Sequence, residues 1–65
     1  MNEIEKNLLT LLKDKFPEEL KDIDDIFMCE GGFAHNNENV EFDGDFYYEM
    51  IDFANQNGFK IEVCV

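Results

Sequence analysis

Residues 43–58 read DGDFYYEMIDFANQNG, and this run predicts a helix with one apolar side and one acidic side. Asp43 or Asp45 can cap its N-terminus, where the helix dipole favours negative charge. The apolar residues recur at helical spacing on one broad face: Phe46, Tyr47, Met50, Ile51, Phe53 and Ala54. Asp45, Glu49 and Asp52 share the opposite face, and the Asn-Gly pair that closes the run ends the helix.

A second amphipathic helix is expected over residues 2–16, upstream of this run. Asn2 can cap it, and Glu5 stands three residues later, where a capping box requires Glu or Gln. The apolar positions at helical spacing are Ile4, Leu8, Leu11, Leu12 and Phe16. Pro17 disfavours helical geometry at the residue before it, and Pro17–Asp22 can form one further turn.

Three short strands are expected between and after the helices. Residues 26–29 form an apolar run bounded by Asp and Gly, and residues 40–42 alternate between apolar and acidic. Gly31-Gly32 is expected to turn the chain, and residues 33–39 form either the tip of a long hairpin or an irregular loop. Residues 59–65 alternate apolar with other residues, which predicts a half-buried strand.

The expected order is therefore α-β-β-α-β, in a single α+β domain that spans residues 1–65. We expect a three-stranded sheet with two helices packed on one face. The first two strands would pair as a hairpin, and the last would be reached by a right-handed crossover. Apolar residues make up 45% of the chain and aromatic residues 14%, which favours a folded domain over a disordered acidic tail.

The charge is distributed very unevenly along the chain. The net charge is −11, and from Asp22 to Phe59 there are ten carboxylates and no Lys or Arg. We call residues 22–59 the base-free span. Like charges held this close oppose folding, so a chain that keeps them either gains solubility or meets a positive partner. Direct binding of nucleic acid is not expected, because no basic patch is present to neutralise phosphates.

No specific metal site is expected. Residues 39–45 place oxygen ligands at alternate positions as an EF-hand loop does, but position 12 of that pattern is Met50 instead of Glu. A loose association of magnesium or calcium with the acidic surface is more plausible. Cys29, His35 and Cys64 lack the paired spacing of zinc ligands.

No enzymatic activity or cofactor is expected either. Paired carboxylates are abundant and therefore uninformative, and a domain of this size rarely encloses the apolar pocket that catalysis needs. A negative environment would also disfavour a reactive cysteine thiolate. Both cysteines are expected to be free and buried as small apolar residues.

Two functional hypotheses remain. The first is a non-enzymatic inhibitor whose carboxylates imitate nucleic-acid phosphates and block a basic nucleic-acid-handling protein. The second is a structural or adaptor domain that associates through hydrophobic surface, for example as a homodimer paired along its last strand. Phe33 is expected to be packed in the core. For the first hypothesis the expected partner-binding residues are Glu41, Asp43, Asp45, Tyr48, Glu49 and Asp52, with Tyr48 as an aromatic anchor.

In length, acidity and lack of motifs the chain resembles small phage-encoded inhibitors of host defence, including DNA mimics and anti-CRISPR proteins. This resemblance extends over the whole chain and rests on no motif, so it assigns no residue a role. The N-terminus shows no signal peptide, and no stretch is long and apolar enough to span a bilayer. A soluble cytoplasmic protein without membrane binding is therefore expected.

Overall fold

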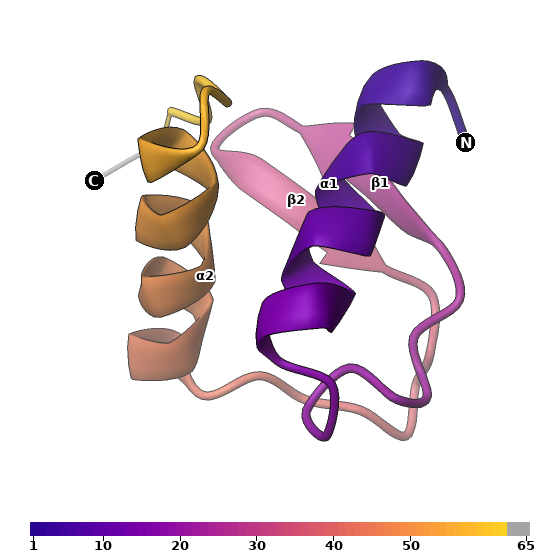
Figure 1. Cartoon of the computed structure of the whole chain (residues 1–65). Coiled ribbons are helices and arrows are strands. Elements are labelled where there is room, and N and C mark those ends of the chain that lie inside the picture. The colour runs from indigo at the N-terminus through magenta and orange to yellow at the C-terminus, as the bar shows by residue number, and fades with distance from the viewer. Residues whose placement is uncertain (63–65) are drawn as a thin grey trace.

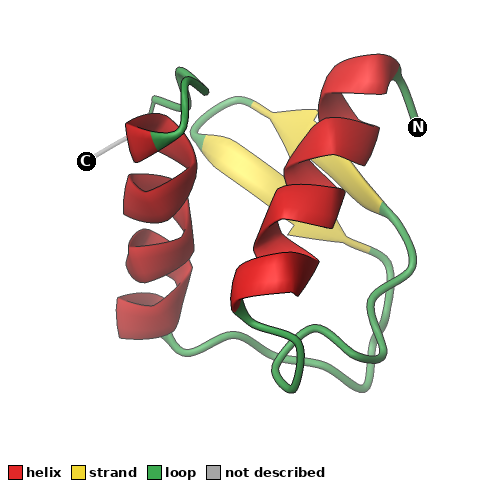
Figure 2. Ribbon diagram, in the orientation of Figure 1, coloured by secondary structure: helices red, strands yellow, loops and turns green. Residues whose placement is uncertain are grey.

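The computed structural model describes residues 1–62, which form two helices and a two-stranded antiparallel sheet in the order α-β-β-α (Figure 1). The elements are α1 (Glu3–Lys15), β1 (Ile26–Cys29), β2 (Gly32–His35) and α2 (Gly44–Gln56). α1 crosses one face of the hairpin formed by β1 and β2, and α2 lies beside α1 and the hairpin (Figures 1 and 2). The α+β class is as expected, but the predicted three-stranded sheet is wrong.

α1 begins as its sequence predicts. The Glu5 backbone N–H donates to Asn2 Oδ1 at 2.8 Å, and the Asn2 N–H donates back to Glu5 Oε1 at 2.9 Å, which completes the capping box. Leu8 and Leu12 are buried as expected. Ile4 is instead 59% exposed, and Leu9 takes an inward position, so the buried stripe is rotated slightly from the expected one.

The hairpin pairs Met28 with Phe33 and Cys29 with Gly32 across a turn in which Gly31 and Gly32 have φ of 88° and 148°. Side chains from both helices cover its two edges. The Met28 N–H donates to Glu5 Oε2 at 2.8 Å on the outer edge of β1. On the outer edge of β2, Tyr47 Oη accepts from the Phe33 N–H at 2.9 Å and donates to the Phe33 carbonyl at 3.0 Å. These contacts occupy backbone groups that could otherwise pair with another strand.

α2 packs its apolar side against α1 and the hairpin. Met50, Ile51 and Ala54 are buried, while Phe46, Tyr47 and Phe53 are partly buried against the core, as the periodicity predicts. Asp43 is the N-cap residue, although its side chain makes no capping hydrogen bond. The remaining buried apolar residues come from α1, the following turns, the hairpin and the C-terminal segment: Leu8, Leu9, Leu12, Phe16, Leu20, Ile23, Ile26, Phe33 and Ile61.

The predicted third strand is not found in the described residues. Residues 59–62 are irregular, and residues 63–65 of that prediction lie outside the described part of the chain. The side-chain amide of Asn55 takes the place of a neighbouring strand. Asn55 Oδ1 accepts from the Ile61 N–H at 2.8 Å, and Asn55 Nδ2 donates to the Ile61 carbonyl at 3.1 Å. Ile61 is therefore buried without joining the sheet.

Two further expectations need correction. The second strand was expected at residues 40–42, but those residues are irregular. The second strand is instead Gly32–His35, in which Phe33 pairs with Met28 and is buried in the core. The packing expected for Phe33 is thus confirmed. Cys29 is exposed instead of buried, since it points away from the helices on the same side of β1 as the 40% exposed Phe27. Cys64 lies outside the described residues.

Substituting Glu5 is expected to make stability less dependent on pH. The backbone N–H groups of Asn2 and Met28 hold the pKa of Glu5 below its ordinary value of 4.5. A lowered folded-state pKa contributes stability that is complete above about pH 4.5 and is lost as the pH falls through the folded pKa. Glu5→Gln should therefore melt below the wild type at neutral pH, and the difference should shrink in acid.

Thermal unfolding followed by circular dichroism at about pH 7 and about pH 3 measures this difference. Glu3→Gln is the matched control, because Glu3 is exposed in the same helical turn. A difference between wild type and Glu5→Gln that stays the same at both pH values would contradict the role of the Glu5 carboxylate.

Candidate protein-interaction surface

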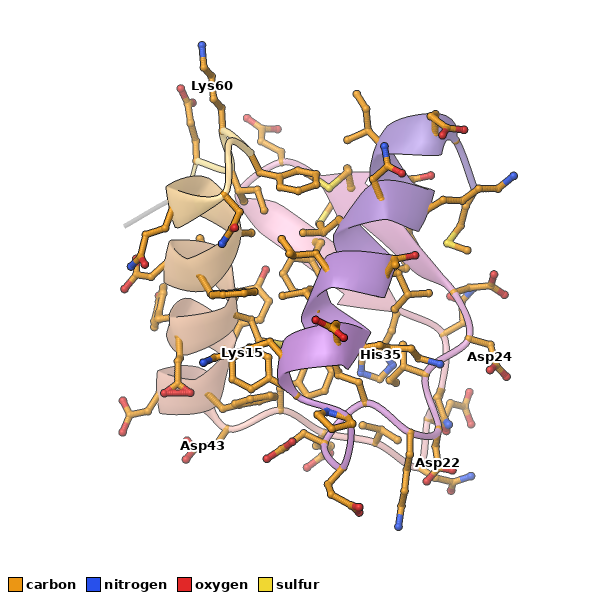
Figure 3. The ribbon with its side chains drawn as sticks, viewed as in Figure 1. Lys15, Asp22, Asp24, His35, Asp43 and Lys60 are labelled. Carbon is orange, nitrogen blue, oxygen red and sulfur yellow. The ribbon has the colours of Figure 1, made fainter. Side chains whose placement is uncertain are left out.

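Five exposed carboxylates follow one another from the segment before α2 along the outward side of that helix. We call them the α2 acidic face: Glu41, Asp43, Asp45, Glu49 and Asp52. The packing of α2 explains their exposure, because the apolar residues of the helix face α1 and the hairpin. Asp43 lies at the start of α2, at the opposite end of the molecule from Lys60 (Figure 3).

In the part of the chain that the structure describes, none of these carboxylates forms an ion pair with a lysine. Among residues 1–62 the single ion pair joins Lys13 Nζ to Asp24 Oδ1 at 4.0 Å, and it involves no member of the α2 acidic face. The negative charge of this face is therefore directed towards solvent. An approaching cationic partner would not have to displace an internal ion pair first.

A groove of about 650 Å³ runs between the end of α1 and the acidic side of α2. It is lined by Lys15, Phe16, Asp45, Tyr48, Glu49, Asp52, Phe53 and Gln56. Phe16 contacts Phe53 edge-on at a centroid distance of 5.9 Å and Phe46 at 5.1 Å. This aromatic packing joins the end of α1 to α2 and gives the groove an apolar wall beside three of the predicted carboxylates.

Tyr48 is 48% exposed on the rim of this groove, with its ring centroid 6.0 Å from that of Tyr47. The structure thus brings Tyr48 together with Asp45, Glu49 and Asp52, while Glu41 and Asp43 lie outside the groove in the preceding segment. Four further residues line the groove and were not predicted from the sequence: Lys15, Phe16, Phe53 and Gln56. The position of Phe53, four residues after Glu49 and therefore next to it on the helix surface, was the available signal.

Three other acids of the base-free span are separate from the α2 acidic face. Asp22, Asp24 and Asp25 line a smaller depression of about 190 Å³ with Asn36 and Asn37. Asp22 and Asp24 lie on the side of the molecule away from α2 (Figure 3). The segment from β2 to α2 connects the two regions along one edge of the molecule (Figure 2).

His35, which was considered above as a zinc ligand, is engaged by neighbouring residues. His35 Nδ1 accepts from the Asn37 N–H at 3.1 Å, and the imidazole packs against Phe42 at a centroid distance of 4.8 Å. Within residues 1–62, no three His, Cys, Asp or Glu side chains are grouped so as to hold a metal ion. None of the helices in the described part of the chain has the length and apolar character needed to cross a membrane.

No protein-family model matches the chain, and comparisons with curated proteins and with solved structures found no significant match. Any assignment of function therefore rests on the residues and their arrangement.

Proposed function

We propose that the protein is a non-enzymatic interaction module that binds a basic, nucleic-acid-handling protein and blocks its access to nucleic acid. The α2 acidic face supplies the negative charge, and Tyr48 supplies an aromatic anchor at its rim. In keeping with the small phage-encoded inhibitors that the chain resembles, we place its action in the cytoplasm, against a component of host defence.

The observation that carries this proposal is the exposure of all five carboxylates of the α2 acidic face without any ion pair to a described lysine. A folded domain with a net charge of −11 bears the cost of self-repulsion, and these residues contribute to that cost without a described internal partner. Along α2 the spacings of four and three residues separate successive carboxylates by about 5–6 Å. This separation resembles that of neighbouring phosphates on a nucleic-acid strand.

A second candidate is an adaptor that associates through hydrophobic surface. The exposure of Phe27 on the side of β1 that points away from the helices favours this candidate. The strand edge on which a homodimer was expected to form is not supported, because residues 59–62 form no strand. Light scattering over a range of concentrations tests this candidate. Self-association that Phe27→Ser abolishes would favour the adaptor over the inhibitor.

Neutralising the α2 side chains is expected to weaken partner binding about ten-fold or more, since three carboxylates in contact with a basic surface would be lost. The test is affinity capture from a host lysate with wild type and with the triple variant Asp45→Asn, Glu49→Gln, Asp52→Asn. Captured proteins are identified and then bound in purified form at low and moderate salt.

The matched control is Asp22→Asn, Asp24→Asn, Asp25→Asn, which removes the same charge from the smaller depression that these three residues line. The proposal requires that a basic nucleic-acid-binding protein is retained by wild type and by the control and lost by the α2 variant. Equal retention by both variants, or retention that salt does not affect, would count against it.

A further inference from the structure

One cation of the protein already lies against the groove beside the α2 acidic face. Lys15 Nζ is 5.5 Å from the centroid of the Phe53 ring, a distance at which an ammonium group is attracted to an aromatic face. Lys15 comes from the last turn of α1 and reaches towards α2 (Figure 3). Within residues 1–62 its ammonium makes no ion pair with Asp45, Glu49 or Asp52, although all of them line the same groove.

The groove therefore combines aromatic surface with carboxylates, and these can recognise different parts of a guanidinium group. Phe53 and Tyr48 present aromatic surface, and Asp45, Glu49 and Asp52 present carboxylates around it. A planar guanidinium can stack on an aromatic ring while its edge donates paired hydrogen bonds to a carboxylate. An ammonium is a compact, strongly hydrated charge and cannot make both contacts in this way.

We propose that this groove binds an arginine side chain of the basic partner, and that Lys15 is an internal competitor that leaves the Phe53 ring when the arginine enters. This inference rests on the proposed function, and it identifies the side chain of the partner that the groove binds. Charge complementarity identifies the occupant, because the groove carries three carboxylates against one lysine. Lys15 is exposed in the last turn of α1, and its long flexible side chain can leave the Phe53 ring without movement of the backbone.

The probes are two peptides of equal length and charge, nona-arginine and nona-lysine, titrated calorimetrically into the full chain. The arginine peptide should bind about three-fold more tightly than the lysine peptide. Lys15→Gln should raise affinity for the arginine peptide about three-fold, because the internal competitor is removed.

Removing any lysine makes the protein more acidic, so Lys6→Gln is the matched control. Lys6 is exposed on the same helix, nine residues and about 13 Å from Lys15 along its axis. The affinity gained by Lys15→Gln must exceed that gained by Lys6→Gln. Phe53→Leu, checked for folding by circular dichroism, should remove the preference for arginine while lysine-peptide binding remains.

The outcomes separate this inference from the proposed function. If both peptides bind equally, with a steep salt dependence, and Lys15→Gln behaves as Lys6→Gln does, the inference of an arginine site is wrong. Binding of a basic partner through the α2 acidic face would still be supported. If neither peptide binds at low salt, both are wrong. The arginine preference, its loss in Phe53→Leu and the specific gain in Lys15→Gln together establish the site.

Discussion

Replacing Gly32 with alanine is expected to lower the free energy of unfolding by about 3 kcal/mol. Gly32 has φ of 148°, a conformation that strains any residue with a Cβ. The added Cβ would also collide with the Tyr47 hydroxyl, which bridges the N–H and carbonyl of Phe33. The substitution therefore strains the turn and displaces the group that covers the outer edge of β2. Equilibrium unfolding in urea measures the loss.

Two variants separate these causes. Gly58 has φ of 98°, and a Cβ added there would meet open space, so Gly58→Ala should cost about 1 kcal/mol from backbone strain alone. In a Tyr47→Phe background the hydroxyl is absent, and Gly32→Ala should cost less than it does in the wild type. Strictly additive effects of Gly32→Ala and Tyr47→Phe would show that the hydroxyl and the turn are not coupled.

Replacing Met50 with alanine is expected to cost about 2–5 kcal/mol, because it leaves a cavity in the centre of the core. Met50 is 0% exposed, and it lies on the side of α2 that faces α1 and the hairpin. A domain of 65 residues has a total stability of about 3–10 kcal/mol, so this single substitution should unfold much of the protein. Thermal unfolding by circular dichroism measures the effect.

Glu49→Ala is the matched control, since Glu49 precedes Met50 on the same helix and is exposed. Its effect on stability should lie within about 0.5 kcal/mol. Equal losses from Met50→Ala and Glu49→Ala would contradict the division of α2 into a packed side and a solvent-facing side. The contrast matters for function, because it shows that the acids can be changed without disturbing the fold.

The two helices were predictable because local signals determine them. The capping box of Asn2 and Glu5 starts α1, and the 3.6-residue period of α2 places Met50 and Ala54 inside and Glu49 outside. The exposure of Ile4 and the burial of Leu9 were not predictable at this level. They depend on the angle at which α1 crosses the hairpin, which the helical period alone does not determine.

The strands were less predictable because long-range contacts position them. β2 contains Gly32 and His35, which have no strong strand preference, and it is held by the Tyr47 hydroxyl from a distant helix. Alternation around Ile61 suggested a strand, but the Asn55 amide satisfies the backbone of Ile61 instead. An alternating pattern indicates that one side of the segment is buried. It does not specify which group makes hydrogen bonds with the backbone of that segment.

The candidate surface was predictable in part. The spacing of Asp45, Glu49 and Asp52 along one helix side was sufficient to group them with Tyr48. Lys15 and Phe16 could not be added, because their place beside α2 depends on how the two helices pack. The contact of Lys15 with Phe53, from which the arginine site was inferred, joins residues 38 positions apart in the chain.

Competition between the protein and duplex DNA for the captured partner tests the proposed function most directly. Dissociation constants are measured over a range of salt concentrations for wild type and for the α2 triple variant. If the protein blocks access to nucleic acid, binding should be mutually exclusive, the affinity of the wild type should fall steeply with salt, and the variant should show a shallower slope. Simultaneous binding of protein and DNA to the partner, or identical salt slopes for wild type and variant, would contradict the proposed function.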